Sequence, residues 1–215
     1  MRIWQNLKGT INRLIQNRRK RYQESLARKN KNKNPTIIAN DCLGGMIYHT
    51  LGLKFNSPTI NLQIGREDFL IFCEDLKGFL SAELKQVDTK ETYPVGELTS
   101  SSKTIRLLFL HYKTFEEAKT KWDERKARVN YDNLYIIQTM ALDVKRSEVE
   151  RFDALPQKNK MLVIGSNQYH SKNAAIVKKL FKKKEFQGGM IFWWKGRFSR
   201  KRYMDDLNYV KFLNG

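Results

Sequence analysis

The chain alternates between short apolar runs and longer segments whose apolar residues recur every three or four positions. The runs that indicate buried strands are residues 35–40, 59–64, 104–112, 134–139 and 161–165. Helical spacing covers residues 43–49, 66–83, 115–129, 147–155 and 174–181. Because the strand segments are largely unbroken apolar runs, the pattern predicts an α/β domain. Its largely parallel sheet should carry helices on both faces in a Rossmann-like arrangement.

A separate basic segment precedes this domain. Its apolar residues keep helical spacing from residue 3 to residue 26, and arginine and lysine fill the other faces, which predicts a basic amphipathic helix. The following run, 28–34, holds only arginine, lysine and asparagine and predicts a solvated linker. The chain therefore divides into three parts. They are the helix and linker at 1–34, the α/β domain at 35–185, and a C-terminal extension at 186–215 packed on the same domain.

The positive charge is concentrated at the two ends of the chain. The formal net charge is +19, and residues 1–34 and 172–202 each carry eleven lysine and arginine residues against one acid. The rest of the chain is close to neutral. Two cationic segments around a near-neutral body predict a protein that works against a polyanionic surface, whether anionic lipid, nucleic acid or an acidic polymer.

Three roles fit the N-terminal helix. Its apolar stripe can pack on the body and leave a solvated basic face. It can lie in a membrane interface, where basic residues contact anionic headgroups. It can also be a basic arm for nucleic acid, although the apolar stripe exceeds what such an arm needs. We favour membrane contact, through Trp4, Leu7, Ile11, Arg18, Arg19, Lys20 and Arg21.

Polar residues follow the predicted strands. In open α/β sheets, ligands bind at the carboxyl edge, where strands end. Any one of these residues is typical of an ordinary strand end, but together they predict a polar cleft. They are Asn40 and Asp41, His111 and Tyr112, Thr139 and Asp143, and Ser166, Asn167 and His170.

The segment 40–49 offers the best local chemistry. Gly44 and Gly45 let the backbone approach a ligand at a helix start, where free N–H groups attract an anion. Asp41 can act as a base or bind a hydroxyl, and Cys42 can be a nucleophile. The alternative is a tight turn in which Asp41 caps the helix and Cys42 is buried.

Two candidates lie further along the chain. His111 ends a predicted strand and is either a base or a structural residue. Arg125 lies on a helix whose charged face is typical of solvent exposure, but it can also turn inward to a phosphate. No zinc-enzyme or serine-hydrolase motif occurs, so we predict no metal site of that kind. A divalent ion held by carboxylates needs no such motif.

The C-terminal extension mixes aromatic and basic side chains. They can stack on bases or sugars or anchor at a headgroup layer, or residues 190–194 can form a core strand before a basic loop. The absence of a nucleic-acid-binding signature disfavours nucleic acid as partner. Two cysteines, no secretory signal and no apolar stretch near the ~20 residues that span a bilayer predict a cytoplasmic protein, soluble or peripheral.

Several sequence blocks together resemble a known family. They are residues 40–49 (NDCLGGMIYH), 51–62 (LGLKFNSPTINL), 93–96 (YPVG), and His111-Tyr112 with FEEA at 115–118 and Trp122. Their order and spacing are similar to bacterial proteins of unknown function usually labelled exopolysaccharide or capsule biosynthesis proteins. The resemblance covers most of residues 35–165. It implies an α/β fold and a setting in surface-polysaccharide assembly, without an established reaction or assigned catalytic residues.

That setting fits the basic ends, because surface glycans are commonly assembled on lipid carriers at the inner face of the membrane. We expect a peripheral transferase there, most simply a glycosyltransferase that moves a sugar from a nucleotide-sugar to a membrane-linked glycan. The alternatives are a non-catalytic glycan- or membrane-binding protein of the same machinery and an RNA-binding protein. The cofactor and the oligomeric state are undetermined, and a divalent metal beside the donor is compatible with the sequence.

The candidate site residues fall into two groups. The catalytic candidates are Asp41 or His49 as the base for the acceptor hydroxyl, with His111 as a second candidate. The ligand-binding candidates are Gly44, Gly45 and Arg125 for the donor phosphates, Ser57 and Asn61 for the shape of the pocket, and Asn40, Tyr112, Ser166 and Asn167 at the strand ends.

Overall fold

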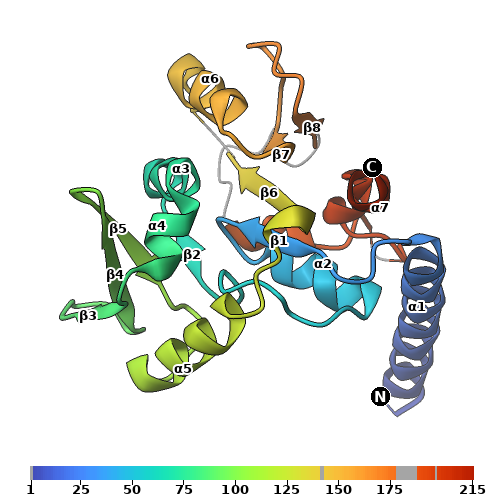
Figure 1. Ribbon diagram of the computed structural model, residues 1–215. Coiled ribbons are helices and arrows are strands. Elements are labelled where there is room, and N and C mark those ends of the chain that lie inside the picture. Colours follow the sequence, from blue (N-terminus) through green and yellow to red (C-terminus); the bar gives the residue numbers. More distant parts are fainter. Residues whose placement is uncertain (1, 141–142, 178–187, 197) are drawn as a thin grey trace.

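A computed structural model describes residues 2–140, 143–177, 188–196 and 198–215, with the side chains of residues 2–10 and Gly188 outside the description. The α-helices are α1 (Arg2–Lys29), α2 (Leu43–Leu51), α3 (Arg66–Glu74), α4 (Leu76–Ser81), α5 (Phe115–Lys126), α6 (Arg146–Ala154) and α7 (Tyr209–Asn214). The strands are β1 (Thr36–Ala39), β2 (Gln63–Ile64), β3 (Lys85–Val87), β4 (Val95–Ser100), β5 (Lys103–Leu108), β6 (Leu134–Thr139), β7 (Asn159–Ile164) and β8 (Ala174–Ile176). Short 3-10 helices are η1 (Tyr131–Asn133), η2 (Gly188–Phe192) and η3 (Tyr203–Asp206) (Figure 1).

A four-stranded parallel sheet lies at the centre, in the order β1, β6, β7, β8. β1 and β6 are buried along their whole length, as their largely apolar sequences predict. Neighbouring side chains point to opposite faces, so Ile37 packs on the α2 side while Ile38 packs with α3 and α6. The predicted Rossmann-like α/β fold, preceded by a basic helix, is confirmed.

A second sheet is antiparallel, in the order β2, β5, β4, β3, and the sequence pattern does not predict it. The strand expected at 104–112 is β5 of this sheet, and only Gln63–Ile64 of the strand expected at 59–64 forms. β4 and β5 are joined through Ser101 and Ser102, whose φ angles are 47° and 65°. Such tight hairpin turns usually carry Asn-Gly or Asp-Gly, so a Ser-Ser turn leaves no signal in the sequence.

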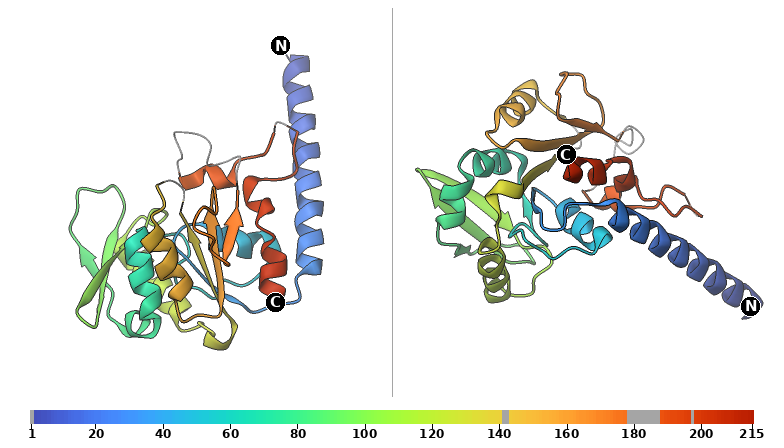
Figure 2. Two further views of the ribbon diagram at one scale, coloured as in Figure 1. Left: turned by 90° about the horizontal axis from the view of Figure 1, so that it is seen from above. Right: turned by 45° about the vertical axis from the view of Figure 1, so that its right-hand side comes forward.

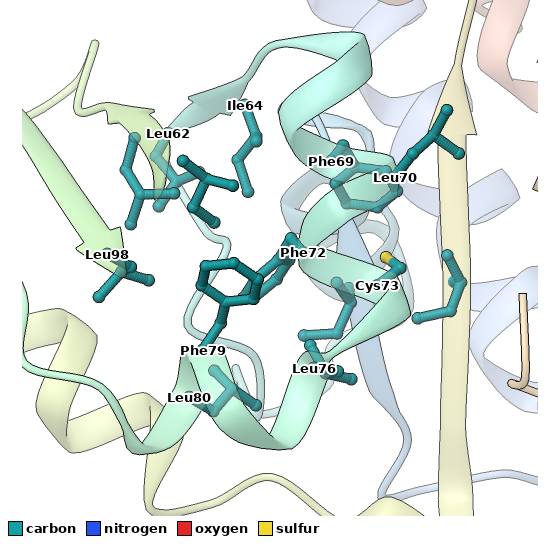
Figure 3. Close-up of a cluster of buried hydrophobic side chains, with 14 of the residues drawn as sticks. Leu62, Ile64, Phe69, Leu70, Phe72, Cys73, Leu76, Phe79, Leu80 and Leu98 are labelled. Atoms are coloured by element: carbon teal, nitrogen blue, oxygen red, sulfur yellow. The ribbon is translucent and has the colours of Figure 1, made fainter. Parts of the chain in front are cut away.

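The larger apolar core fills the space between the two sheets (Figure 3). The expected helix at 66–83 is broken at Asp75, whose side chain caps α4 by accepting from the Gly78 N–H. The ring of Phe72 lies 6.0 Å from that of Phe79 and 6.4 Å from that of Trp122, which brings α5 into the same core.

The other face of the parallel sheet is covered by α2 and the C-terminal segment, from which Met190, Met204 and Leu213 are buried. The expectation of a helix is wrong at residues 174–176, which form strand β8. Of the alternatives left open for 190–194, the core strand does not form, because residues 188–192 are a 3-10 helix. Short apolar runs fit either structure, so only their packing decides between them. The rest of the helix expected at 174–181, from residue 178, lies outside the described residues.

The C-terminal half of α1 is fixed to the body, while its N-terminal part extends beyond it (Figure 2). Arg19 is only 3% exposed, and its guanidinium contacts the fully buried side chain of Asp205 and the carbonyl of Arg200. The guanidinium of Arg200 lies 5.6 Å from the ring centre of Tyr22 on α1. Arg19, which we expected at a membrane, is therefore a buried structural residue.

The run 28–34 is not the solvated linker that its composition predicts. Asn30 is buried, and the side-chain amide of Asn32 donates to Asn133, to the Tyr135 hydroxyl and to the Leu213 carbonyl at 2.8, 3.0 and 3.1 Å. An asparagine side chain carries both donors and an acceptor, so a polar run of this kind can bond to the body instead of to water. α1 therefore enters the domain through a hydrogen-bonded segment.

We expect Asp205→Asn to lower the free energy of unfolding by about 3–5 kcal/mol, because the buried Arg19 loses its charged partner. The neighbouring Asp206 pairs with Lys195 at a more exposed position, so Asp206→Asn should cost less than about 1 kcal/mol. Urea unfolding measures both variants. Equal, small losses would show that the buried pair does not hold α1.

Candidate functional site

A cavity of about 940 Å³ opens at the carboxyl ends of β1 and β6, where the two sheets meet. Its wall comes from the β1–α2 turn, the segment 55–66, the loop after β5 and the C-terminal segment. This volume lies within the range of small-molecule sites, roughly 300–1,000 Å³. The polar side chains on the wall are Asn40, Asp41, Cys42, His49, Asn61, Gln63, Arg66, His111 and Thr139.

Asn40 joins the elements around this cavity. Its side-chain oxygen accepts from the Thr139 N–H at 2.8 Å, and its side-chain amide donates to the Thr139 carbonyl at 3.3 Å. Its own carbonyl accepts from the Ile64 N–H at 2.9 Å. Asn40 thus ties β1 to β6 in one sheet and to β2 of the other, and its side chain is committed to the scaffold.

Cys42 and His111 meet at the cavity wall. Cys42 directly precedes α2 and His111 follows β5, 69 residues later, yet Cys42 Sγ and His111 Nε2 lie 3.3 Å apart. His111 is exposed and Cys42 half-buried, so both reach the cavity. Burial and the nearby Asp41 raise the pKa of the Cys42 thiol to about 11. A neutral thiol beside an imidazole is a pair that can move a proton.

Asp41 points its carboxylate back at the start of α2, where it accepts from the Leu43 N–H at 2.9 Å. This is the cap that the turn alternative predicts, although the residue also lines the cavity. Burial raises the pKa of Asp41 above its ordinary 3.8, against the opposing hydrogen bond from Leu43. A carboxyl with a raised pKa is suited to exchange protons at a site.

The two glycines of α2 have different surroundings. Gly45 lines the cavity, and a Cβ there would meet Ile60 at an ordinary 3.5 Å. Gly44 packs on β1, where a Cβ would lie 3.0 Å from the Cβ of Ala39. Gly45 is therefore the member of the pair open to a ligand. His49, in the last turn of α2, is exposed and lines the same cavity.

Three predicted ligand-binding residues lie behind the wall rather than on it. The Arg125 guanidinium donates to the Tyr112 hydroxyl at 2.7 Å and to the Ile60 carbonyl at 3.3 Å. Tyr112 donates to the same carbonyl at 3.2 Å, and Ser57 is fully buried against Thr59. The prediction that Arg125 contacts a phosphate is wrong, because its guanidinium is buried and hydrogen-bonded to the Ile60 carbonyl.

The remaining predicted ligand-binding residues divide between the cavity and a distant loop. Asn61 lines the cavity with a φ of 64°, a conformation that asparagine tolerates better than most residues. Ser166 and Asn167 follow β7 and do not line the cavity; Asn167 instead closes a loop by bonding to Ser171.

The residues predicted to contact a membrane lie along α1. The side chains of Trp4 and Leu7 lie outside the described residues. Ile11 is half-buried, and the exposed residues are Arg18, Lys20 and Arg21.

Several cavity residues escape the sequence analysis, among them Gln63, Arg66 and Phe192. Arg66 begins α3 and lies 3.6 Å from Glu148, whereas Phe192 ends the 3-10 helix of the C-terminal segment. Their local sequence carries no site signal, because they reach the cavity only through the packing of distant segments.

No three histidine, cysteine, aspartate or glutamate residues stand together as a metal site within the described part of the chain. Among the same residues, no helix has the length and apolar character needed to cross a membrane.

The fold and the cavity define an α/β protein with a thiol–imidazole pair at the carboxyl edge of its parallel sheet. Residues 13–214 match the family described as domain of unknown function DUF1919, and the chain belongs to that family. An uncharacterized protein of Haemophilus influenzae is 34% identical over 216 residues, covering 100% of this chain and 99% of the relative. The family thus extends beyond the blocks at 35–165, into α1 and the C-terminal segment.

The raised pKa of Asp41 predicts a pH dependence of stability. Between its ordinary value of 3.8 and the higher folded value, the folded state binds more protons, so the free energy of unfolding falls as pH rises. Asp41→Asn keeps an oxygen that accepts from the Leu43 N–H, but its side chain does not ionise, so the fall in the free energy of unfolding with rising pH disappears. The variant should gain stability over the wild type as pH rises from about 4, measured by urea unfolding at several pH values.

Asp75 provides a control of opposite sign. A hydrogen bond from Ser100 lowers the pKa of Asp75 in the folded state. The stabilisation from ionised Asp75 is therefore fully present above the pKa of the unfolded state and is lost as pH falls through the pKa of the folded state. Asp75→Asn should therefore lose stability relative to the wild type as pH rises. A difference between Asp41→Asn and the wild type that does not vary with pH would contradict the prediction for Asp41.

Proposed function

We propose that this protein is a peripheral transferase of bacterial surface-polysaccharide assembly that moves a glycosyl group from a nucleotide-sugar to a membrane-linked glycan. The observation that carries the proposal is the cavity at the carboxyl edge of the parallel sheet, with Asp41 in its wall. Open α/β sheets bind ligands at this edge, and about 940 Å³ suits a ligand of that size. The polysaccharide setting rests on the resemblance of the blocks between residues 40 and 122.

The start of α2 and Arg66 supply contacts for the donor diphosphate. The first N–H groups of a helix have no partner within it and attract phosphate. Gly45 leaves the backbone open to the cavity at this point, and Arg66 adds a positive charge to the same wall. A diphosphate held between them leaves the sugar near the β1–α2 turn.

Asp41 is the base of the proposed reaction. Glycosyl transfer needs a group that removes the proton of the acceptor hydroxyl as the new C–O bond forms. The raised pKa of Asp41 supports this role, because it brings the carboxyl nearer to the pH at which it must accept a proton. His49 and His111 line the same cavity and are the second candidates.

Exposed basic and apolar groups on α1 and the C-terminal segment support contact with an anionic membrane. Leu14 is 57% exposed on α1, and Phe198 is 59% exposed in the segment whose Arg200 and Lys201 lie over the Tyr22 ring. The two segments therefore share one surface. An interface with anionic headgroups would satisfy both kinds of side chain.

A thermal-shift and turnover assay tests the donor and the base together. A nucleotide-sugar at 100 times its dissociation constant adds about 2.7 kcal/mol and should raise the melting temperature by roughly 5–10 °C. Asp41→Asn should retain this shift but lower glycosyl transfer by about 10²–10⁴-fold. His170→Asn, at an exposed position that does not line the cavity, should change neither. A folded protein that shifts with no nucleotide-sugar, with or without Mg²⁺ or Mn²⁺, would contradict the proposal.

Vesicle sedimentation tests the membrane surface. Replacing Arg18, Lys20 and Arg21 by glutamine should weaken binding to phosphatidylserine-containing vesicles about 100-fold, since each cation near the surface contributes about 1 kcal/mol. The control replaces three exposed lysines of the body, Lys85, Lys90 and Lys158, and removes the same charge. Equal losses in both variants would show that α1 is not the membrane contact.

A further inference from the structure

Glycosyl transfer with Asp41 as base leaves one reactive pair in the cavity without a role. We infer that Cys42 is a nucleophile and His111 its base, so that the cavity transfers acyl groups through a thioester on Cys42. The inference rests on the 3.3 Å contact between Cys42 Sγ and His111 Nε2. The two residues follow strands of different sheets and meet in one cavity. The inference does not depend on the glycosyl reaction.

The surroundings of Cys42 differ from those of the other thiol in the chain. Cys73 is fully buried in the apolar core between the sheets, where a thiol is inert. Cys42 is half-buried and reaches the cavity beside an imidazole. Accessibility and a base within reach are the two features that separate reactive cysteines from structural ones.

The state of the thiol determines what His111 must do. With a pKa of about 11, Cys42 carries its proton at neutral pH, so attack requires a base that removes this proton during the reaction. His111 can accept it at Nε2 when its own proton is on Nδ1. The start of α2 stabilises the sulfur anion as it forms, because Cys42 stands at the positive end of the helix.

The same helix start can stabilise the oxyanion of the acyl group. The Leu43 N–H is taken by Asp41, whereas the N–H of Gly45, the glycine that lines the cavity, stands at a position where a helix provides no partner of its own. Backbone N–H donors beside a nucleophile are the usual means of holding a tetrahedral intermediate. The nucleophile, Cys42, and the oxyanion donor, the Gly45 N–H, thus both lie at the start of α2.

The donor in the proposed reaction is an activated acyl ester or thioester, and the acceptor is a hydroxyl compound. Cys42 Sγ attacks the acyl carbon, the S–C bond forms while the bond to the leaving group breaks, and His111 passes the thiol proton to that leaving group. The acceptor hydroxyl then attacks the thioester and gives its proton to His111. A new ester leaves, and the proton returns to the sulfur.

The apolar part of the cavity suits such a donor. Met46, Phe55, Ile60, Leu110 and Phe192 line the wall along with the polar residues. An acyl chain or the apolar part of its carrier can be buried against them, while the polar side binds the acceptor. A hydroxyl-bearing glycan is the acceptor class that fits both this chemistry and the proposed setting.

The test uses p-nitrophenyl acetate with the full-length protein. We expect a burst of one p-nitrophenolate per chain and an acetyl thioester on Cys42, located by peptide mass spectrometry. Cys42→Ala should lose the burst, and His111→Asn should slow it by about 10²–10⁴-fold. His111→Asn should also move the rise of the rate toward pH 11, where the thiol ionises unaided. Both substitutions lie on the cavity wall, and thermal melting verifies that the variants are folded.

His170→Asn and Cys73→Ala are the matched controls. They remove a histidine and a thiol that lie away from the cavity and should keep the burst and its pH profile. A burst that survives in Cys42→Ala, a His111→Asn rate equal to the wild type, or acetyl groups only on surface lysines would overturn the inference. No nucleotide-sugar enters this assay, so its outcome is separate from that of the glycosyl proposal.

Discussion

The geometry of this protein depends on one asparagine at the end of a four-residue strand. Asn40 bonds through its side chain to both backbone groups of Thr139 and through its carbonyl to Ile64, so three strands from two sheets converge on it. Breaking such a buried contact leaves polar groups unpaired, which is costly away from water. The β1–α2 turn begins at the next residue. The hydrogen bonds of Asn40 therefore fix the positions of the reactive side chains in this turn.

The second determinant is the way in which the chain ends cover the body. The C-terminal segment completes the core on the α2 face, and Asp205 in the same segment holds Arg19 of α1. Among the described residues, both basic ends therefore carry structural contacts, through Arg19 and Asp205, in addition to their exposed cations. The family match, from residue 13 to residue 214, includes parts of both of these ends.

Local pattern predicts the parallel sheet and fails where packing decides. The pattern identifies β1, β6 and β7 from their apolar runs, whereas the fourth strand, β8, was expected to be a helix. The β4–β5 hairpin, the buried Arg19 and the asparagine contacts depend on partners far away in sequence. Of the polar strand ends, Asn40, Asp41, His111 and Thr139 line the cavity, whereas Tyr112 lies behind its wall and Ser166 and Asn167 lie in a distant loop. The pairing of Cys42 with His111 was not predictable, because it requires knowing that an unpredicted antiparallel sheet sits beside β1.

α1 has 28 residues and is roughly 42 Å long, and its C-terminal half is tied to the body. The buried contact at Arg19 and the bonded segment at Asn32 fix its direction, so it acts as a stiff strut rather than a flexible tether. A flexible tether allows a protein to search every position within its length. A stiff strut allows only one tilt and one height for the cavity above whatever surface holds the outer end. The distance between the cavity and such a surface is then set by the dimensions of the protein itself.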